Sequence, residues 1–323
     1  MVGGSVARVE IGGAGVLRLV EDFERDGSAG DELVALAEDR PELVAPHLLR
    51  LVETNMWLPA FVFRAMTEDT AGEVVRRIDE GLLPPGLYRL AAGRTAAAVD
   101  AFGRWARESP EWLRHFPDGL GKEGHVGGWE LDPAGNRRDL TSRSATALVP
   151  VGEGGAPVSG GALDGKCGWC GLPMWRLLEV DRVLLADLFP DSPGPLVIST
   201  CARCGGYADI FTEQGRFVEE NGEPGFLGED EDGWELPDEG LLALGEARPD
   251  PWATGAGRGW STLGGLPLWG QEPAYPACPR CSRTMPYVGQ VTGRDLDGQW
   301  GQGCHYLFHD PGCGLSAVVY QQT

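Results

Sequence analysis

The residues best suited to chemistry in this chain are its eight cysteines, all of which follow residue 166. They are Cys167, Cys170, Cys201, Cys204, Cys278, Cys281, Cys304 and Cys313. Three Cys-x-x-Cys pairs stand among them, and such a pair can form a disulfide, a redox couple or half of a metal site. The choice among these chemistries decides how the C-terminal part of the chain is stabilised.

The first four cysteines form two Cys-x-x-Cys pairs, Cys167/Cys170 and Cys201/Cys204. Each pair can present two thiolates on one side of a tight turn, and two such turns give tetrahedral sulfur coordination of zinc. We therefore predict a closed, structural zinc site here. A redox pair is the alternative for CGWC, but thioredoxin-type chemistry places its motif at the start of a helix, whereas Gly171 and Pro173 follow this one.

The remaining cysteines repeat the first pattern less regularly. CPRCSRTM at 278–285 has the spacing of CGWCGLPM at 167–174, and Cys313-Gly314 corresponds to Cys204-Gly205. We interpret this as an internal duplication of one unit, which consists of a Cys pair, a strand, a connection, a second pair and a strand.

The fourth ligand of a second metal site has three candidates. Asp310 stands where the duplicated pattern requires a cysteine, Cys304 begins an apparent strand, and His309 precedes Cys313 at a spacing that closes readily around zinc. The favoured ligand set is Cys278, Cys281, His309 and Cys313. The other interpretations are ligation through Cys304 or Asp310, and a degenerate unit without metal. The sequence thus predicts one zinc ion, and a second where this set is complete.

The elements that position these residues fall into two regions. Residues 1–122 read as short amphipathic helices punctuated by Pro and Gly, with one helix starting at Pro41 after a break at Arg40. We expect an array that resembles HEAT-type repeats. Residues 123–323 are rich in Gly, Pro and aromatic residues and begin with a predicted hairpin, WELDPAGNRRDL. The expected fold class is α+β, a helical region followed by a β-rich, duplicated zinc-knuckle domain.

Charge divides the β-rich domain further. We place module one at 151–218, an acidic connection at 219–258 and module two at 259–323. Fourteen acidic and two basic residues lie between 205 and 250, which accounts for more than half of the net charge of −21. Such a run is either a solvated loop or a docking surface for a basic ligand. The charge argues against binding to nucleic acid or anionic membranes, because both require a basic surface.

The sequence also indicates a compartment. No stretch reads as a signal peptide, and no apolar run approaches the length of a membrane helix. We therefore expect a reducing cytoplasm, where structural disulfides are disfavoured.

The two cysteine-containing units resemble a known bacterial family. GGLPLWGQEPAYPACPRCSRTMPYVGQV at 264–291, followed by GCHYLFHDPGCGLSAVVYQ, is similar to the YwqG-like proteins. These form a superfamily with the eukaryotic programmed-cell-death-protein-two and twenty-S-rRNA-accumulation factors. The resemblance covers 123–323 and implies a β-rich fold with zinc knuckles and no established catalytic centre. It also implies protein or peptide binding, as a chaperone or as an immunity protein against a toxin.

These observations favour a non-enzymatic, zinc-stabilised module that binds a basic protein or peptide. An aromatic groove for an extended peptide would come from Trp260, Trp269, Tyr275, Tyr287 and Trp300, which otherwise serve as core. No GxSxG, P-loop, HExxH or dinucleotide motif supports an enzyme. A metal-dependent hydrolase or thiol redox protein, and a scaffold subunit that uses the helical region, are the alternatives.

Overall fold

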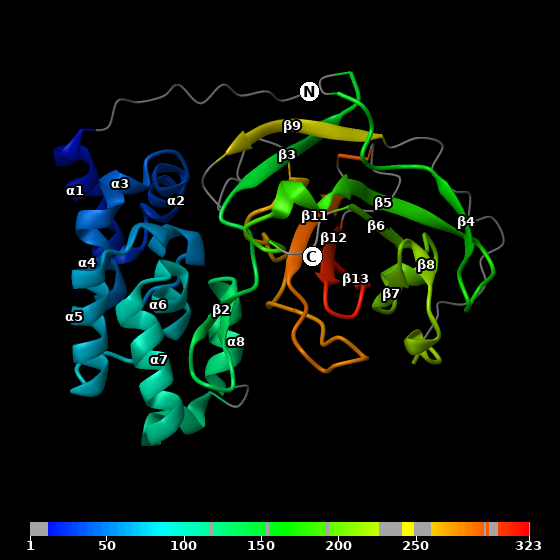
Figure 1. Ribbon diagram of the computed structural model, residues 1–323. Coiled ribbons are helices and arrows are strands. Elements are labelled where there is room, and N and C mark those ends of the chain that lie inside the picture. The colour runs from blue at the N-terminus through cyan, green and yellow to red at the C-terminus, as the bar shows by residue number, and fades with distance from the viewer. Residues whose placement is uncertain are drawn as a thin grey trace. The chain divides into compact units, whose positions relative to one another are not determined.

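The computed structural model describes residues 12–116, 119–152, 155–190, 194–225, 241–248, 260–293, 295–296 and 303–322. The chain divides into two units, Met1–Arg138 and Asp139–Thr323. The first contains helices and one short hairpin, and the second contains two β-sheets (Figure 1). The α+β class predicted from the sequence is therefore confirmed.

The first unit is a succession of short helices. They are α1 (Gly13–Asp26), α2 (Gly30–Asp39), α3 (Pro41–Val44), η1 (Ala45–His47), α4 (Leu48–Glu53), η2 (Ala60–Ala65), α5 (Glu68–Asp79), α6 (Leu87–Gly93), α7 (Ala96–Glu108), η3 (Glu111–His115) and α8 (Gly119–Val126). None of the helices in the described residues is both long and apolar enough to cross a membrane.

The helix boundaries follow local signals in the sequence. α3 starts at Pro41, which has no backbone N–H to leave unbonded in a first turn, and the chain breaks at Arg40 as predicted. α5 and α7 each follow a threonine, Thr67 and Thr95, whose hydroxyl accepts the N–H of the residue three positions later. The helical character of this region is confirmed, and its resemblance to HEAT-type repeats stays a prediction.

The predicted hairpin exists, but it belongs to the first unit. Its strands are β1 (Trp129–Leu131) and β2 (Arg137–Asp139). Trp129 is fully buried, its ring centroid lies 5.1 Å from that of Phe102, and its indole N–H donates to the carbonyl of Ala91. Because these contacts tie the hairpin to the helices, the boundary lies after Arg138 and not at residue 122, where the sequence placed it.

The second unit contains an eight-stranded and a three-stranded sheet, and all their pairs are antiparallel. The broad sheet has the order β8-β7-β13-β12-β11-β10-β3-β9, and the small sheet β4-β5-β6. The strands are β3 (Ala145–Pro150), β4 (Ala162–Lys166), β5 (Pro173–Asp181), β6 (Pro195–Thr200), β7 (Ile210–Glu213), β8 (Arg216–Phe217), β9 (Leu242–Arg248), β10 (Thr262–Gly264), β11 (Tyr287–Thr292), β12 (Cys304–Asp310) and β13 (Leu315–Gln321). The short helices are η4 (Arg182–Leu185), η5 (Cys204–Gly206) and η6 (Glu219–Asn221).

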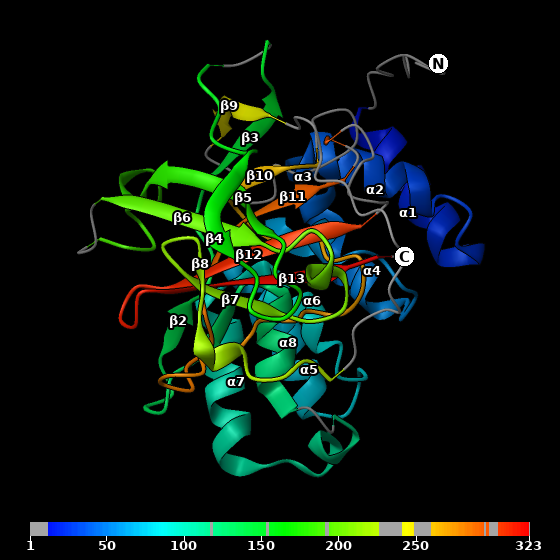
Figure 2. The same cartoon turned by 90° about the vertical axis from the view of Figure 1, so that its right-hand side faces the viewer.

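The broad sheet is covered on both faces, and alternation along β12 explains how. Leu307 belongs to the core that the broad sheet shares with the small sheet, which lies over it in Figure 2. Its neighbours Tyr306 and Phe308 belong to a second core, with Trp269 and Tyr275 of the connection between β10 and β11. Burial on both faces agrees with the burial of every residue of β12 after Cys304, although His305, His309 and Asp310 are polar.

We expect Trp129→Ala to lower the free energy of unfolding by about 3–5 kcal/mol, because removal of a buried aromatic side chain leaves a cavity. Trp57→Ala is the matched control, since the side chain of Trp57 is 76% exposed. Its loss should change stability by less than about 0.5 kcal/mol. Denaturant unfolding of the full chain, monitored by the helical signal in far-ultraviolet circular dichroism, measures both changes in stability. An equal loss in the two variants would contradict the anchoring of the hairpin by Trp129.

Candidate metal centres

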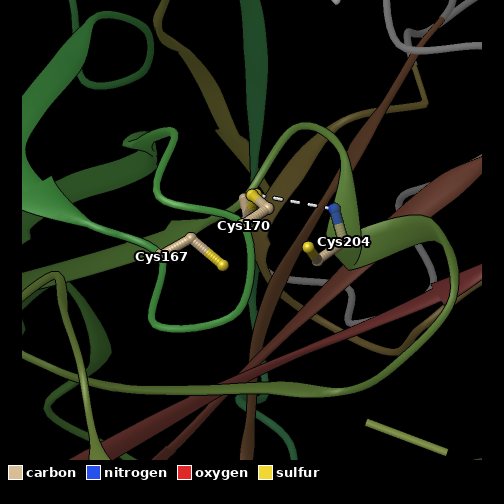
Figure 3. A group of neighbouring side chains, drawn as sticks. Cys167, Cys170 and Cys204 are labelled. Atoms are coloured by element: carbon tan, nitrogen blue, oxygen red, sulfur yellow. Dashed lines mark hydrogen bonds between the residues drawn. The ribbon is translucent and has the colours of Figure 1, made fainter. Parts of the chain in front are cut away.

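The first four cysteines converge on one point, as their spacing predicts. The ligand atoms of Cys167, Cys170, Cys201 and Cys204 all lie within 4.8 Å of one another. Figure 3 shows the sulfur atoms of Cys167, Cys170 and Cys204 directed toward a common space from two separate turns. The Sγ atoms of Cys170 and Cys201 are 3.4 Å apart. Thiolates that are each about 2.3 Å from one tetrahedral ion have nearly this separation, about 3.8 Å.

Each pair is held in a turn of defined geometry. The Cys167 N–H donates to the carbonyl of Leu172 at 2.8 Å, and the Gly171 N–H donates to the carbonyl of Cys167 at 2.9 Å. Gly171 has a φ of 76°, a left-handed conformation that glycine adopts without steric cost. In the second turn the N–H of Cys204 faces the Sγ of Cys201 at 3.5 Å. A backbone donor at this place favours the thiolate form of that sulfur.

The crowding of four thiols has an electrostatic consequence. Hydrogen bonds from Cys201 and Cys204 hold the pKa of Cys167 far below its usual range, to about 2. The pKa of Cys201 and that of Cys204 are raised, because each keeps its proton and donates it in a hydrogen bond to the sulfur of Cys167. Several thiolates can coexist in this space only when a cation neutralises them. The cluster can therefore hold a metal ion.

The second cluster differs from its prediction in one ligand. It brings together Cys278, Cys281, Asp310 and Cys313, whose ligand atoms also lie within 4.8 Å of one another. His309 is buried elsewhere: its Nδ1 lies 3.1 Å from the hydroxyl of Ser316, and its ring stands edge-on to Phe189. Burial lowers the pKa of His309 to about 4.

Strand geometry explains why His309 was the wrong choice. β12 extends through Asp310, and adjacent residues of a strand point to opposite faces, so only one of His309 and Asp310 can reach the cysteines. Cys304, the third candidate, begins β12 and lies about 20 Å away along the strand. Asp310 is the residue that the duplicated pattern indicated.

The Cys167/Cys170 turn of the first cluster and the Cys278/Cys281 turn of the second have the same local geometry. The N–H of Cys278 donates to the carbonyl of Arg283 at 2.8 Å, and that of Ser282 to the carbonyl of Cys278 at 2.8 Å, as Cys167 and Gly171 do in the first turn. Ser282 also takes a left-handed conformation, with a φ of 60°. The similarity of sequence between the two turns is thus a similarity of structure.

Asp310 occupies the place of Cys201 in the second turn of its cluster. The N–H of Cys313 faces the Oδ1 of Asp310 at 3.4 Å, as the N–H of Cys204 faces the sulfur of Cys201. Likewise, the N–H of Gly314 donates to the Asp310 carbonyl at 2.9 Å. A carboxylate oxygen is an accepted zinc ligand at about the same distance as imidazole nitrogen.

Arg283 distinguishes the second cluster from the first. Its guanidinium donates to Asp310 Oδ1 at 3.3 Å and to Cys281 Sγ at 3.5 Å. Burial opposes the ionised carboxylate, but hydrogen bonds from the thiols of Cys281 and Cys278 hold the pKa of Asp310 below its usual value. A resident guanidinium competes with a metal ion for these ligands. We therefore expect the second cluster to bind metal more weakly than the first.

The aromatic residues that could have lined a peptide groove mostly pack inside. Tyr287 is fully buried, and the ring centroid of Trp269 lies 5.3 Å from that of Tyr275 and 4.5 Å from that of Tyr306. A small cavity of about 240 Å³ remains beside Trp269, with Trp260 in its wall. Trp300 and most of the acidic connection, namely 226–240 and 249–258, lie outside the described residues.

Comparison with known proteins gives one clear relative. The uncharacterized protein YpfL of Salmonella typhimurium strain LT2 is 32% identical over 235 residues, which are 70% of this chain and 55% of the relative. The chain thus spans about half the length of this curated relative, whose name assigns no activity. No family model and no solved structure matches the chain.

The ligand assignment predicts the effect of two neighbouring substitutions. Asp310→Ala should reduce bound metal from two ions per chain to one, because it removes a ligand from the second cluster. His309→Gln is the matched control and should leave both ions in place. Elemental analysis of the purified variants measures the difference. Loss of one ion in His309→Gln, with none lost in Asp310→Ala, would overturn the assignment.

Proposed function

We propose that this protein is a zinc-stabilised, non-enzymatic module that binds a basic protein or peptide. The observation that carries the proposal is the closed cluster of four thiols. Tetrahedral sulfur ligation is typical of zinc and of iron–sulfur centres, and two Cys-x-x-Cys turns around one ion are typical of structural zinc. The three buried thiols of this cluster leave little access to substrate.

The geometry gives less support to catalysis. A catalytic zinc keeps one coordination position open for water or substrate, whereas the four cysteines of the first cluster would together fill all four positions of a tetrahedral ion. The CGWC turn lies between β4 and β5, and Pro173 already begins a strand. A redox pair of the thioredoxin kind would instead gain from a helix N-terminus, which lowers the pKa of its nucleophilic thiol.

The matched turns support the inferred duplication, and with it the resemblance to YwqG-like proteins. In each copy of the duplication, a Cys-x-x-Cys turn precedes a strand, which is β5 in the first copy and β11 in the second. The antiparallel partner of that strand, β6 or β12, leads to the second ligand pair. The strands that follow those pairs, β7 and β13, bond to each other. Protein binding, as a chaperone or an immunity protein, is what this resemblance implies for the function.

Charge is the second support for the proposed partner. A chain with a net charge of −21 attracts cationic ligands at long range, and the attraction weakens as salt screens it. We infer that the acidic connection at 219–258 contributes most to this attraction, because its charges are the densest of the chain.

A peptide-binding measurement tests the proposal. We expect the zinc-loaded chain to bind Lys/Arg-rich peptides in preference to Asp/Glu-rich peptides of equal length, with affinity that falls as salt rises. Neutralising the acidic connection through Glu229→Gln, Asp230→Asn, Glu231→Gln and Asp232→Asn should weaken binding about tenfold at low salt. Fluorescence anisotropy with labelled peptides measures both effects.

The matched control neutralises four exposed acids of the helical unit, through Asp31→Asn, Glu32→Gln, Asp69→Asn and Asp100→Asn. It changes the net charge by the same amount. Binding that is insensitive to peptide charge, or that falls equally in both variants, would contradict a docking role for the connection.

A further inference from the structure

One segment of the second unit contacts both metal clusters. It is Phe217–Gly222, the bridging segment, which starts at the end of β8 and includes η6. Its first two side chains pack against different clusters. Phe217 packs against the core formed around the first cluster, and Val218 packs against the core that contains Cys278 of the second. Neighbouring residues of one extended stretch thus belong to two different centres.

The first Cys-x-x-Cys turn holds this segment through Trp169, the residue before its second cysteine. The indole N–H of Trp169 donates to the carbonyl of Gly222 at 2.7 Å, and its ring stands edge-on to Phe217 with centroids 5.2 Å apart. The turn approaches so closely that a Cβ on Gly168 would lie 2.5 Å from the Phe217 ring. A side chain at position 168 would therefore displace the ring of Phe217.

The Cys278/Cys281 turn of the second cluster holds the same segment through Arg280. Arg280, like Trp169, is the residue before the second cysteine of its pair. One guanidinium donates to Glu220 Oε1 at 2.5 Å, to Glu213 Oε2 at 3.1 Å and to the carbonyl of Cys313 at 3.0 Å. Cys313 is a ligand residue of the second cluster. Arg280 thus connects both ligand turns of that cluster to the bridging segment and to β7.

The bridging segment is itself fixed between these two contacts. The Oδ1 of Asn221 accepts the N–H of Phe211 at 2.7 Å, and its Nδ2 donates to the carbonyls of Phe211 and Val218, both at 2.8 Å. These bonds reproduce a strand pairing with β7 through one side chain. The segment is therefore held in one conformation against β7.

We propose that the two metal centres are coupled through the bridging segment, with Trp169 and Arg280 as positioning residues. An ion in either cluster fixes the turn on which the corresponding residue stands, and so holds the segment where the other turn needs it. Each ion then raises the affinity of the other site by the same factor, because coupling between two binding sites is reciprocal. The proposal rests on the proposed function only in that both clusters bind metal; it does not require a peptide partner.

The test breaks the coupling without touching a ligand. Co²⁺ serves as the spectroscopic probe, and its affinity for the first cluster is measured by chelator competition in the full chain. Asp310→Ala, which empties the second cluster, should weaken this affinity several-fold. In a Glu220→Gln background, which removes the negative charge by which the bridging segment holds Arg280, Asp310→Ala should have a much smaller effect. Glu219→Gln is the matched control, an exposed neighbour whose background should preserve the full effect.

Two outcomes would overturn the coupling: an unchanged affinity in Asp310→Ala, or the same loss in the Glu220→Gln background. A chain that binds no metal at all would instead overturn the proposed function. If the Asp310→Ala chain does not fold, hydrogen exchange in the unsubstituted chain decides. Whichever zinc ion leaves the chain first, its release should deprotect the amides of Phe217–Gly222. Protection that persists until the remaining ion also leaves would contradict the proposal.

Discussion

Four sulfur atoms share one small space at the point where the small sheet meets the start of β7. The core around them consists of Cys167, Met174, Cys201, Cys204 and Ile210, so cysteines make up most of the buried interior at this place. An ion bound by these thiolates would link the turn before β5 to the end of β6, and thereby the small sheet to the start of β7. Ligation can contribute about 10–16 kcal/mol to folding, which offsets the loss of a thicker core.

Local spacing was sufficient to predict the turns, because a Cys-x-x-Cys turn is set by the residues within it. The helices around Pro41 and the hairpin at Trp129 were predictable for the same reason. The identity of the fourth ligand in the second cluster depends on where β12 ends, which the spacing of His309 and Cys313 does not reveal. The internal repeat carried that information, since it aligned Asp310 with Cys201.

Long-range contacts decided the remaining points. The burial of Trp129 against Phe102 assigns the hairpin to the helices, although its composition resembles that of the β-rich region. The bridging segment joins two turns that are far apart in sequence, through Trp169 and Arg280, and neither residue has a type that marks it as a connector. The pairing of β7 with β13 likewise follows from the packing of two similar units, which a periodic pattern cannot specify.

The central claim is that an ion bound by the four thiolates stabilises the second unit. Thermal unfolding of zinc-loaded and chelator-stripped protein tests it most directly, when far-ultraviolet and near-ultraviolet circular dichroism are recorded together. The account predicts that stripping removes the cooperative tertiary transition of the second unit, while the helical signal of the first unit persists and serves as an internal reference. Identical melting of the two samples, with the same tertiary signal, would show that the sheets hold together without an ion and would contradict the account.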